Sequence, residues 1–159
     1  MKDAKYWLDQ GILYTKQGAA SKALLAFDKC IAKDPLYFAA WMNRGNVLGM
    51  LGKHKEALKC YDKALKIQPE YAPAFFNKGL ILGELNRLDE ELLEYDQAVK
   101  IDPHFIPAWY NRAITLGKMG KMEEGYESLK TALKLSKDLG LLEISDLIQK
   151  FLKELENNV

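Results

Sequence analysis

The sequence predicts an all-α fold made of four helix–turn–helix units in tandem, followed by one terminal helix. The first observation is a 34-residue period: residues 38–69 match residues 72–103 and 106–137 after forward shifts, and residues 4–35 after a backward shift. The second is a helical spacing of apolar residues within each half of the unit. Such self-similarity indicates a repeat architecture, in which each hairpin buries its apolar faces against its neighbours.

The same landmark residues return in every unit. An aromatic residue opens each one, a small residue follows four positions later, and a second large residue lies in the second half. In that order they are Trp7, Trp41, Phe75 and Trp109; Gly11, Gly45, Gly79 and Ala113; and Phe27, Tyr61, Tyr95 and Leu129. The small residues are expected where two helix backbones approach, with the large ones filling the adjoining space.

This pattern resembles the tetratricopeptide repeat family, whose unit is a 34-residue helix–turn–helix. Repeat two carries the whole family pattern: Trp41, Gly45, Leu48, Ala57, Tyr61, Ala64 and Pro69. The other repeats depart from it at Glu91, Gly125, Ala113 and Lys137. The resemblance implies an all-α, right-handed α-solenoid in one domain over residues 1–159, with repeats at 4–37, 38–71, 72–105 and 106–139.

Helix boundaries follow from local breakers and caps. In repeat two the first helix is expected over about residues 38–50, before Gly52, and the second helix should stop at Pro69. Pro73 and Pro107 fall in the first turn of their helices, where proline is tolerated. Residues 140–156 are predicted to form an amphipathic capping helix over the last open face. The total expected is nine helices and no strand.

Composition limits the partners. Lys and Arg number 23 and Asp and Glu 22, so the net charge of +1 argues against a nucleic-acid partner. No apolar run has membrane-spanning length, and the first residues lack the apolar core of a signal peptide, so we expect a cytoplasmic protein without a membrane partner. Cys30 and Cys60 are interpreted as reduced structural thiols.

Catalytic motifs are missing from the sequence. It contains no phosphate-binding loop, GxGxxG motif or nucleophile elbow. His54 and His104 have no Cys, Asp or Glu at metal-ligand spacing and are interpreted as surface polar residues. We therefore expect no enzyme activity, no metal and no cofactor.

The resemblance implies that the first helix of each repeat lines a concave surface. Residues carried over to it form an apolar floor, consisting of Leu8, Ile12, Met42, Phe76, Leu80, Tyr110 and Ile114. Its polar residues are Asn43, Asn77 and Asn111, spaced by one repeat, together with Asn46. An apolar strip favours protein binding, and asparagine suits a peptide backbone because its amide both donates and accepts. Two alternatives remain open: the asparagines are inherited and only hydrated, or the terminal helix covers the floor.

The predicted function is a non-catalytic adaptor or scaffold that binds a peptide or helix of a partner protein in this groove. The alternative is a self-associating structural module that uses the terminal helix or the groove. The apolar side of the terminal helix is wider than one neighbour covers, so we expect a monomer or a weak homo-oligomer.

The dicarboxylate clamp that some family members use for chaperone C-termini is not expected. Its two lysines and its arginine would fall on Leu8, Pro73 and Asn77 if the clamp began at repeat one. They would fall on Met42, Pro107 and Asn111 if it began at repeat two. Without these cations nothing would neutralise the carboxylates.

Charged residues also recur at one repeat position each. Arg44, Lys78 and Arg112 share the seventh position, and Asp28, Asp62 and Asp96 share the twenty-fifth. Repeat one has no cation there, and repeat four no acid. This distribution predicts an ion pair across each junction: Asp28 with Arg44, Asp62 with Lys78, and Asp96 with Arg112.

Overall fold

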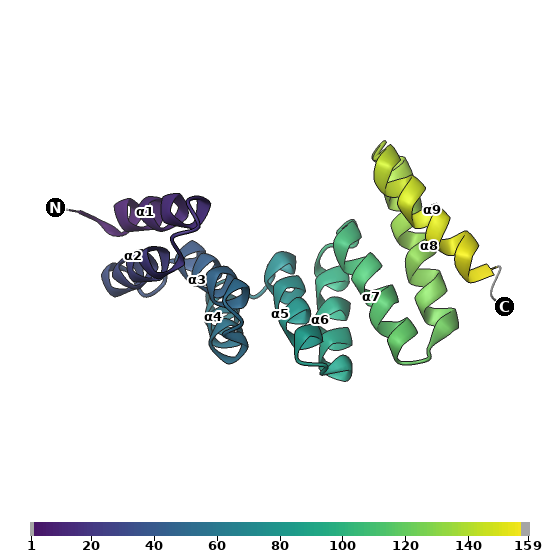
Figure 1. The fold of residues 1–159 in the computed structure, drawn as a ribbon, viewed down its shortest axis with the longest axis horizontal. Helices are drawn as coiled ribbons and strands as arrows, with labels where there is room; N and C mark the ends of the chain where they lie inside the picture. The colour runs from purple at the N-terminus through teal and green to yellow at the C-terminus, as the bar shows by residue number, and fades with distance from the viewer. Residues whose placement is uncertain (1, 157–159) are drawn as a thin grey trace. The chain divides into compact units, whose positions relative to one another are not determined.

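The structure is a computed structural model that describes residues 2–156. Within that range the chain forms nine helices and no strand, which confirms the all-α prediction (Figure 1). The helices are α1 (Ala4–Lys16), α2 (Ala20–Lys33), α3 (Phe38–Met50), α4 (His54–Ile67), α5 (Ala72–Glu84), α6 (Leu88–Ile101), α7 (Ile106–Lys118), α8 (Met122–Asp138) and α9 (Leu142–Glu156).

The chain divides into two compact units, Met1–Ile81 and Leu82–Val159, and the division falls inside α5. Unit 1 holds α1–α4 and most of α5, and unit 2 holds the end of α5 with α6–α9. The single-domain organisation stays a prediction.

In unit 1 a glycine sits where the two helices of each hairpin meet. A Cβ added to Gly11 would lie 2.3 Å from Cε1 of Phe27, and one added to Gly45 would lie 2.8 Å from Cε1 of Tyr61. Both rings are buried. The small residue is therefore what lets the large one enter the hairpin, as the repeat pattern predicts.

The turn inside each repeat requires a residue with positive φ. Gly52 takes this place in repeat two with φ 71°, and Asn86 takes it in repeat three with φ 54°. Glycine has no Cβ to clash in this region, and asparagine tolerates it better than most other residues. The sequence thus ends the first helix of the hairpin at a fixed point.

Unit 2 is closed by α9. Ile148 and Leu152 of α9 are buried in a core cluster with Ile106 of α7 and Leu129 of α8. The helix begins at Leu142, two residues later than expected, because Gly140 has φ 68° and belongs to the turn after α8. A buried hydrogen bond of 2.9 Å from Ser145 Oγ to Ser136 Oγ joins α9 to α8.

Candidate functional site

Two residues of the apolar floor predicted from the sequence, Leu8 and Met42, are buried in unit 1. Leu8 and Met42 are 8% and 7% exposed, and Ile12 packs against the core cluster that contains Leu8. Leu80 is exposed and Phe76 is partly buried. The surfaces of Leu8 and Met42 therefore serve the fold, and a binding role for these residues stays a prediction.

Two of the repeated asparagines bind their own helices. Nδ2 of Asn43 donates to the carbonyl oxygen of Ala39 over 2.7 Å, and Nδ2 of Asn111 donates to that of Pro107 over 2.9 Å. Each amide thus commits one N–H to the backbone four residues earlier. The other N–H and the side-chain oxygen are what a bound peptide would have to use.

Asn46 is the acceptor in a small network of unit 1. Its Oδ1 accepts a hydrogen bond of 2.8 Å from the Tyr61 hydroxyl and one of 3.0 Å from Nδ2 of Asn77. Burial raises the pKa of the Tyr61 phenol, so the hydroxyl keeps its proton and remains a donor. This network ties α3 to α4 and α5, which is a structural role for Asn46 and Asn77.

Unit 2 contains an open apolar groove between α7 and α9, with a volume of about 370 Å³. It is called the α7–α9 groove here, and its lining consists of His104, Phe105, Ile106, Pro107, Tyr110, Asn111, Leu141, Ile144, Leu147 and Ile148. Leu147 is 60% exposed and Ile144 is 41% exposed, whereas Ile148 is buried. The groove therefore offers apolar side chains to solvent.

The sequence identified only part of this lining. Tyr110 and Asn111 were expected on the binding surface, and Ile114, partly buried in α7, does not line the groove. The contribution of α9, including Ile144 and Leu147, was missed, although the wide apolar side of the terminal helix was the signal that could have indicated it.

The structure contains the three ion pairs expected across the repeat junctions. Nε of Arg44 lies 2.8 Å from Oδ1 of Asp28, and Nε of Arg112 lies 2.6 Å from Oδ1 of Asp96. The third pair joins Nζ of Lys78 to Oδ1 of Asp62 over 3.0 Å. The cation side chains are 16–23% exposed and the acids 42–55%, so water reaches the acids and weakens each pair.

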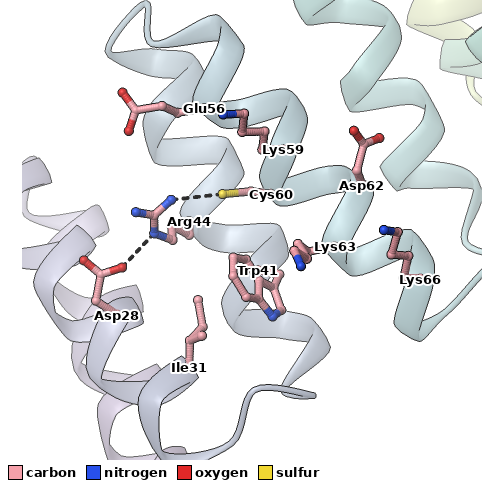
Figure 2. Close-up of a pocket in the computed structure, with 10 residues that line it drawn as sticks. All are labelled: Asp28, Ile31, Trp41, Arg44, Glu56, Lys59, Cys60, Asp62, Lys63 and Lys66. Atoms are coloured by element: carbon pink, nitrogen blue, oxygen red, sulfur yellow. Dashed lines mark hydrogen bonds and ion pairs between the residues drawn. The ribbon is translucent and has the colours of Figure 1, made fainter.

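Each arginine also binds a second acceptor within its own repeat. Nη1 of Arg44 donates to Sγ of Cys60 over 3.1 Å, and Nη1 of Arg112 donates to Oγ of Ser128 (Figure 2 shows the Arg44 contacts). Burial raises the pKa of the Cys60 thiol more than the Arg44 hydrogen bond lowers it. The sulfur is therefore a neutral and weak acceptor, whereas the serine oxygen is a better one.

Metal-ligand groupings are absent from the described part of the chain, where no three His, Cys, Asp or Glu residues are placed to hold an ion. Cys30 and Cys60 are free and buried. Among residues 2–156, no helix combines the length and apolar character needed to span a bilayer.

Sequence profiles of the tetratricopeptide repeat match this chain over residues 38–71 and over residues 60–92 and 94–126. No curated protein sequence matches it. Among solved structures it is similar to a crystal structure of MamA, with a TM-score of 0.84 and 21% identity over 87% of this chain and 81% of that one.

Two further structures show the same fold. One is MamA 41-end from Desulfovibrio magneticus RS-1, with a TM-score of 0.79 and 22% identity over 86% of this chain and 77% of that one. The other is the first TPR of Spaghetti (RPAP3) bound to the HSP90 peptide SRMEEVD, with a TM-score of 0.71 and 21% identity over 74% of this chain and 94% of that one. The helix–turn–helix hairpins, their small-residue contacts and the matching profiles lead to one conclusion: the chain belongs to the tetratricopeptide repeat family.

Proposed function

We propose that this chain is a non-catalytic protein–protein interaction module that holds an apolar segment of a partner protein in the α7–α9 groove. The observation that carries this proposal is the open apolar lining, in which Ile144 and Leu147 expose one continuous side of α9. Exposed apolar surface of this kind marks interaction sites, because leaving it in water is unfavourable.

The groove suits the side chains of a longer segment. A volume of about 370 Å³ is at the small end for a ligand site, so it accommodates one or two anchor side chains. His104, Tyr110 and Asn111 are the residues in the lining with side-chain donors or acceptors for a peptide backbone. A partner helix or strand would place apolar anchors at regular intervals along the groove.

Self-association is the competing use of the same surface. Leu142 is 73% exposed on the first turn of α9, close in sequence to the groove residues Leu141 and Ile144. Two copies that shared this surface would form a symmetric dimer. Sedimentation equilibrium of the natural chain and of Leu147→Glu separates the two functions. A dimer that forms with the natural chain and is abolished by Leu147→Glu would favour self-association over partner binding.

Selection from a random peptide display library against the full chain tests the proposal. We expect peptides with large apolar residues to be recovered by the natural sequence and lost with Leu147→Glu. Leu25→Glu is the matched control, because Leu25 on α2 is similarly exposed, at 57% against 60%, and undergoes the same chemical change. Equal recovery by both variants, or equal loss, would contradict the groove assignment.

The location of the protein and the classes of partner that it does not bind are also part of this proposal. A cytoplasmic location and the lack of nucleic-acid and membrane partners stay predictions. A chaperone C-terminus is not proposed, because Leu8, Pro73 and Asn77 stand where the clamp would need cations.

A further inference from the structure

A row of lysines marks α4. Lys55, Lys59, Lys63 and Lys66 follow one another at intervals of four, four and three residues, which places them on one side of the helix. The other repeats do not share the row: their residues at these positions are Ser21, Leu25, Lys29 and Ala32; Asp89, Leu93, Gln97 and Lys100; and Glu123, Glu127, Thr131 and Lys134. Repeat architecture alone therefore does not explain it.

Three of these lysines line a hollow of about 550 Å³ in unit 1 (Figure 2). This surface, called the α4 hollow, lies between α2, α3 and α4 and is lined by Asp28, Ile31, Trp41, Arg44, Glu56, Lys59, Cys60, Asp62, Lys63 and Lys66. It combines an apolar part, Ile31 and Trp41, with a charged rim.

Within residues 2–156, most acids of the α4 hollow are in ion pairs, whereas its lysines are not. Asp28 is paired with Arg44, and Asp62 is paired with Lys78. Lys59, Lys63 and Lys66 have no ion pair in the described part of the chain, and Glu56 is the one carboxylate of the lining outside such a pair. Three unpaired cations against one unpaired anion leave the rim attractive to acidic groups.

Trp41 is held in place but not covered by a cation. Its Nε1 donates to the carbonyl oxygen of Pro35 over 2.9 Å, which fixes the ring. Trp7, the equivalent residue of repeat one, has Nζ of Lys29 at 4.2 Å from its ring centroid. Among the described residues no cation lies over the Trp41 ring in this way, so the ring contributes to the α4 hollow.

We propose that the α4 hollow is a second docking site, which binds an acidic polypeptide segment carrying one large apolar side chain. The apolar side chain contacts Trp41 and Ile31, while carboxylates of the segment pair with Lys59, Lys63 and Lys66. The intervals of four and three residues match the spacing of carboxylates on one side of a bound helix.

Charge complementarity favours a polypeptide over other anionic partners. The lining itself carries Asp28, Glu56 and Asp62, which would repel the continuous phosphate chain of a nucleic acid. The net charge of the whole chain, +1, gives no long-range attraction to such a polymer or to an anionic bilayer. A peptide can place its carboxylates opposite the lysines and leave the acids of the hollow uncontacted.

The site is separate from the one proposed above, because the α4 hollow and the α7–α9 groove share no residue. The same display library therefore reports on both. We expect the natural chain to recover an additional class of peptides, rich in Asp and Glu with one large apolar residue. This class should survive Leu147→Glu, which removes only the apolar class of the groove.

The decisive variant is the triple change Lys59→Glu, Lys63→Glu and Lys66→Glu. A control with the same spacing exists on α8, where Lys130, Lys134 and Lys137 border a hollow that has no aromatic residue in its lining, and where Lys130 is paired with Glu127 over 2.8 Å. Fluorescence anisotropy with a recovered acidic peptide should show an affinity loss of about tenfold or more for the α4 triple variant. For the α8 triple variant the loss should be less than about twofold. Circular dichroism verifies that both variants keep their helices.

Three results would overturn the proposal. The first is the absence of an acidic class from the recovered peptides. The second is an equal effect of the two triple variants, since this would show unspecific attraction to lysines. The third is displacement of the acidic peptide by duplex DNA or by phosphatidylserine vesicles at matched charge concentration, which would assign the surface to that partner instead.

Discussion

Met42 and Tyr110 occupy the same position in repeats two and four, yet Met42 is buried in unit 1 and Tyr110 lines an open groove in unit 2. In unit 2 the groove beside Tyr110 is bordered by α9, which buries Ile148 and Leu152 but leaves the side chains of Ile144 and Leu147 exposed. Residues at the same repeat position therefore differ in their exposure to solvent, and in unit 2 the surface that stays open is the one bordered by α9.

Among the changes that test this comparison, removal of α9 should have the largest effect on stability. Truncation after Lys137 takes Ile148 and Leu152 out of the core of unit 2, and each such side chain contributes about 1.5–3 kcal/mol when buried. We expect lost cooperativity of unfolding and aggregation, measured by circular dichroism and light scattering. A soluble truncated chain of unchanged stability would show that α9 does not cap the fold.

Met42→Ala and Leu147→Ala compare the two surfaces directly. Met42 is 7% exposed, so its truncation should lower the free energy of unfolding by about 2–5 kcal/mol. Leu147 is 60% exposed, so the same change should cost less than about 0.5 kcal/mol while weakening peptide capture. Urea unfolding followed by circular dichroism gives both values, and similar losses would contradict the account.

The two junction arginines, Arg44 and Arg112, should differ in how much they stabilise the fold, because their second acceptors differ in strength. Arg112→Met removes hydrogen bonds to Asp96 and to the Ser128 oxygen, whereas Arg44→Met loses Asp28 and the weaker Cys60 sulfur. We expect Arg112→Met to cost roughly 1 kcal/mol, because the acid is partly solvated, and Arg44→Met to cost less.

The control for this prediction is the double variant with Asp96→Leu. It leaves no stranded carboxylate, so it should unfold at a higher urea concentration than Arg112→Met alone. If the double variant were less stable than Arg112→Met alone, the Arg112–Asp96 pair would not be the main interaction that stabilises the Asp96 carboxylate.

The smallest effect is expected at the turns. Asn86→Gly relieves a backbone with φ 54° and should raise stability by less than about 1 kcal/mol, while Gly52→Asn should lower it by a similar amount. Thermal unfolding of the two variants measures both changes in stability. Shifts of the same sign in both variants would mean that the turns of repeats two and three are not equivalent.

Much of the fold was predictable because the repeat period carries it. The first helix of repeat two was expected over residues 38–50 and spans Phe38–Met50, since Gly52 and the apolar spacing define its end locally. The charge pairs were predictable for the same reason. Cys60 and Ser128 were missed as second acceptors of Arg44 and Arg112, although they share the twenty-third position of their repeats.

The candidate site was less predictable. The burial of Leu8 and Met42 depends on packing between helices, which the position within a repeat does not specify. The α7–α9 groove depends on how α9 lies against α7 and α8, and α9 is the helix outside the repeat pattern. Its apolar residues were visible in the sequence, but not which of them would remain exposed.

Methyl NMR of the full chain, labelled at Ile and Leu and titrated with a recovered apolar peptide, tests the central claim most directly. The account predicts that the largest shift changes occur at Ile144 and Leu147, which line the α7–α9 groove. Changes confined to Ile12 and Leu80, on the predicted inner face of unit 1, would contradict it.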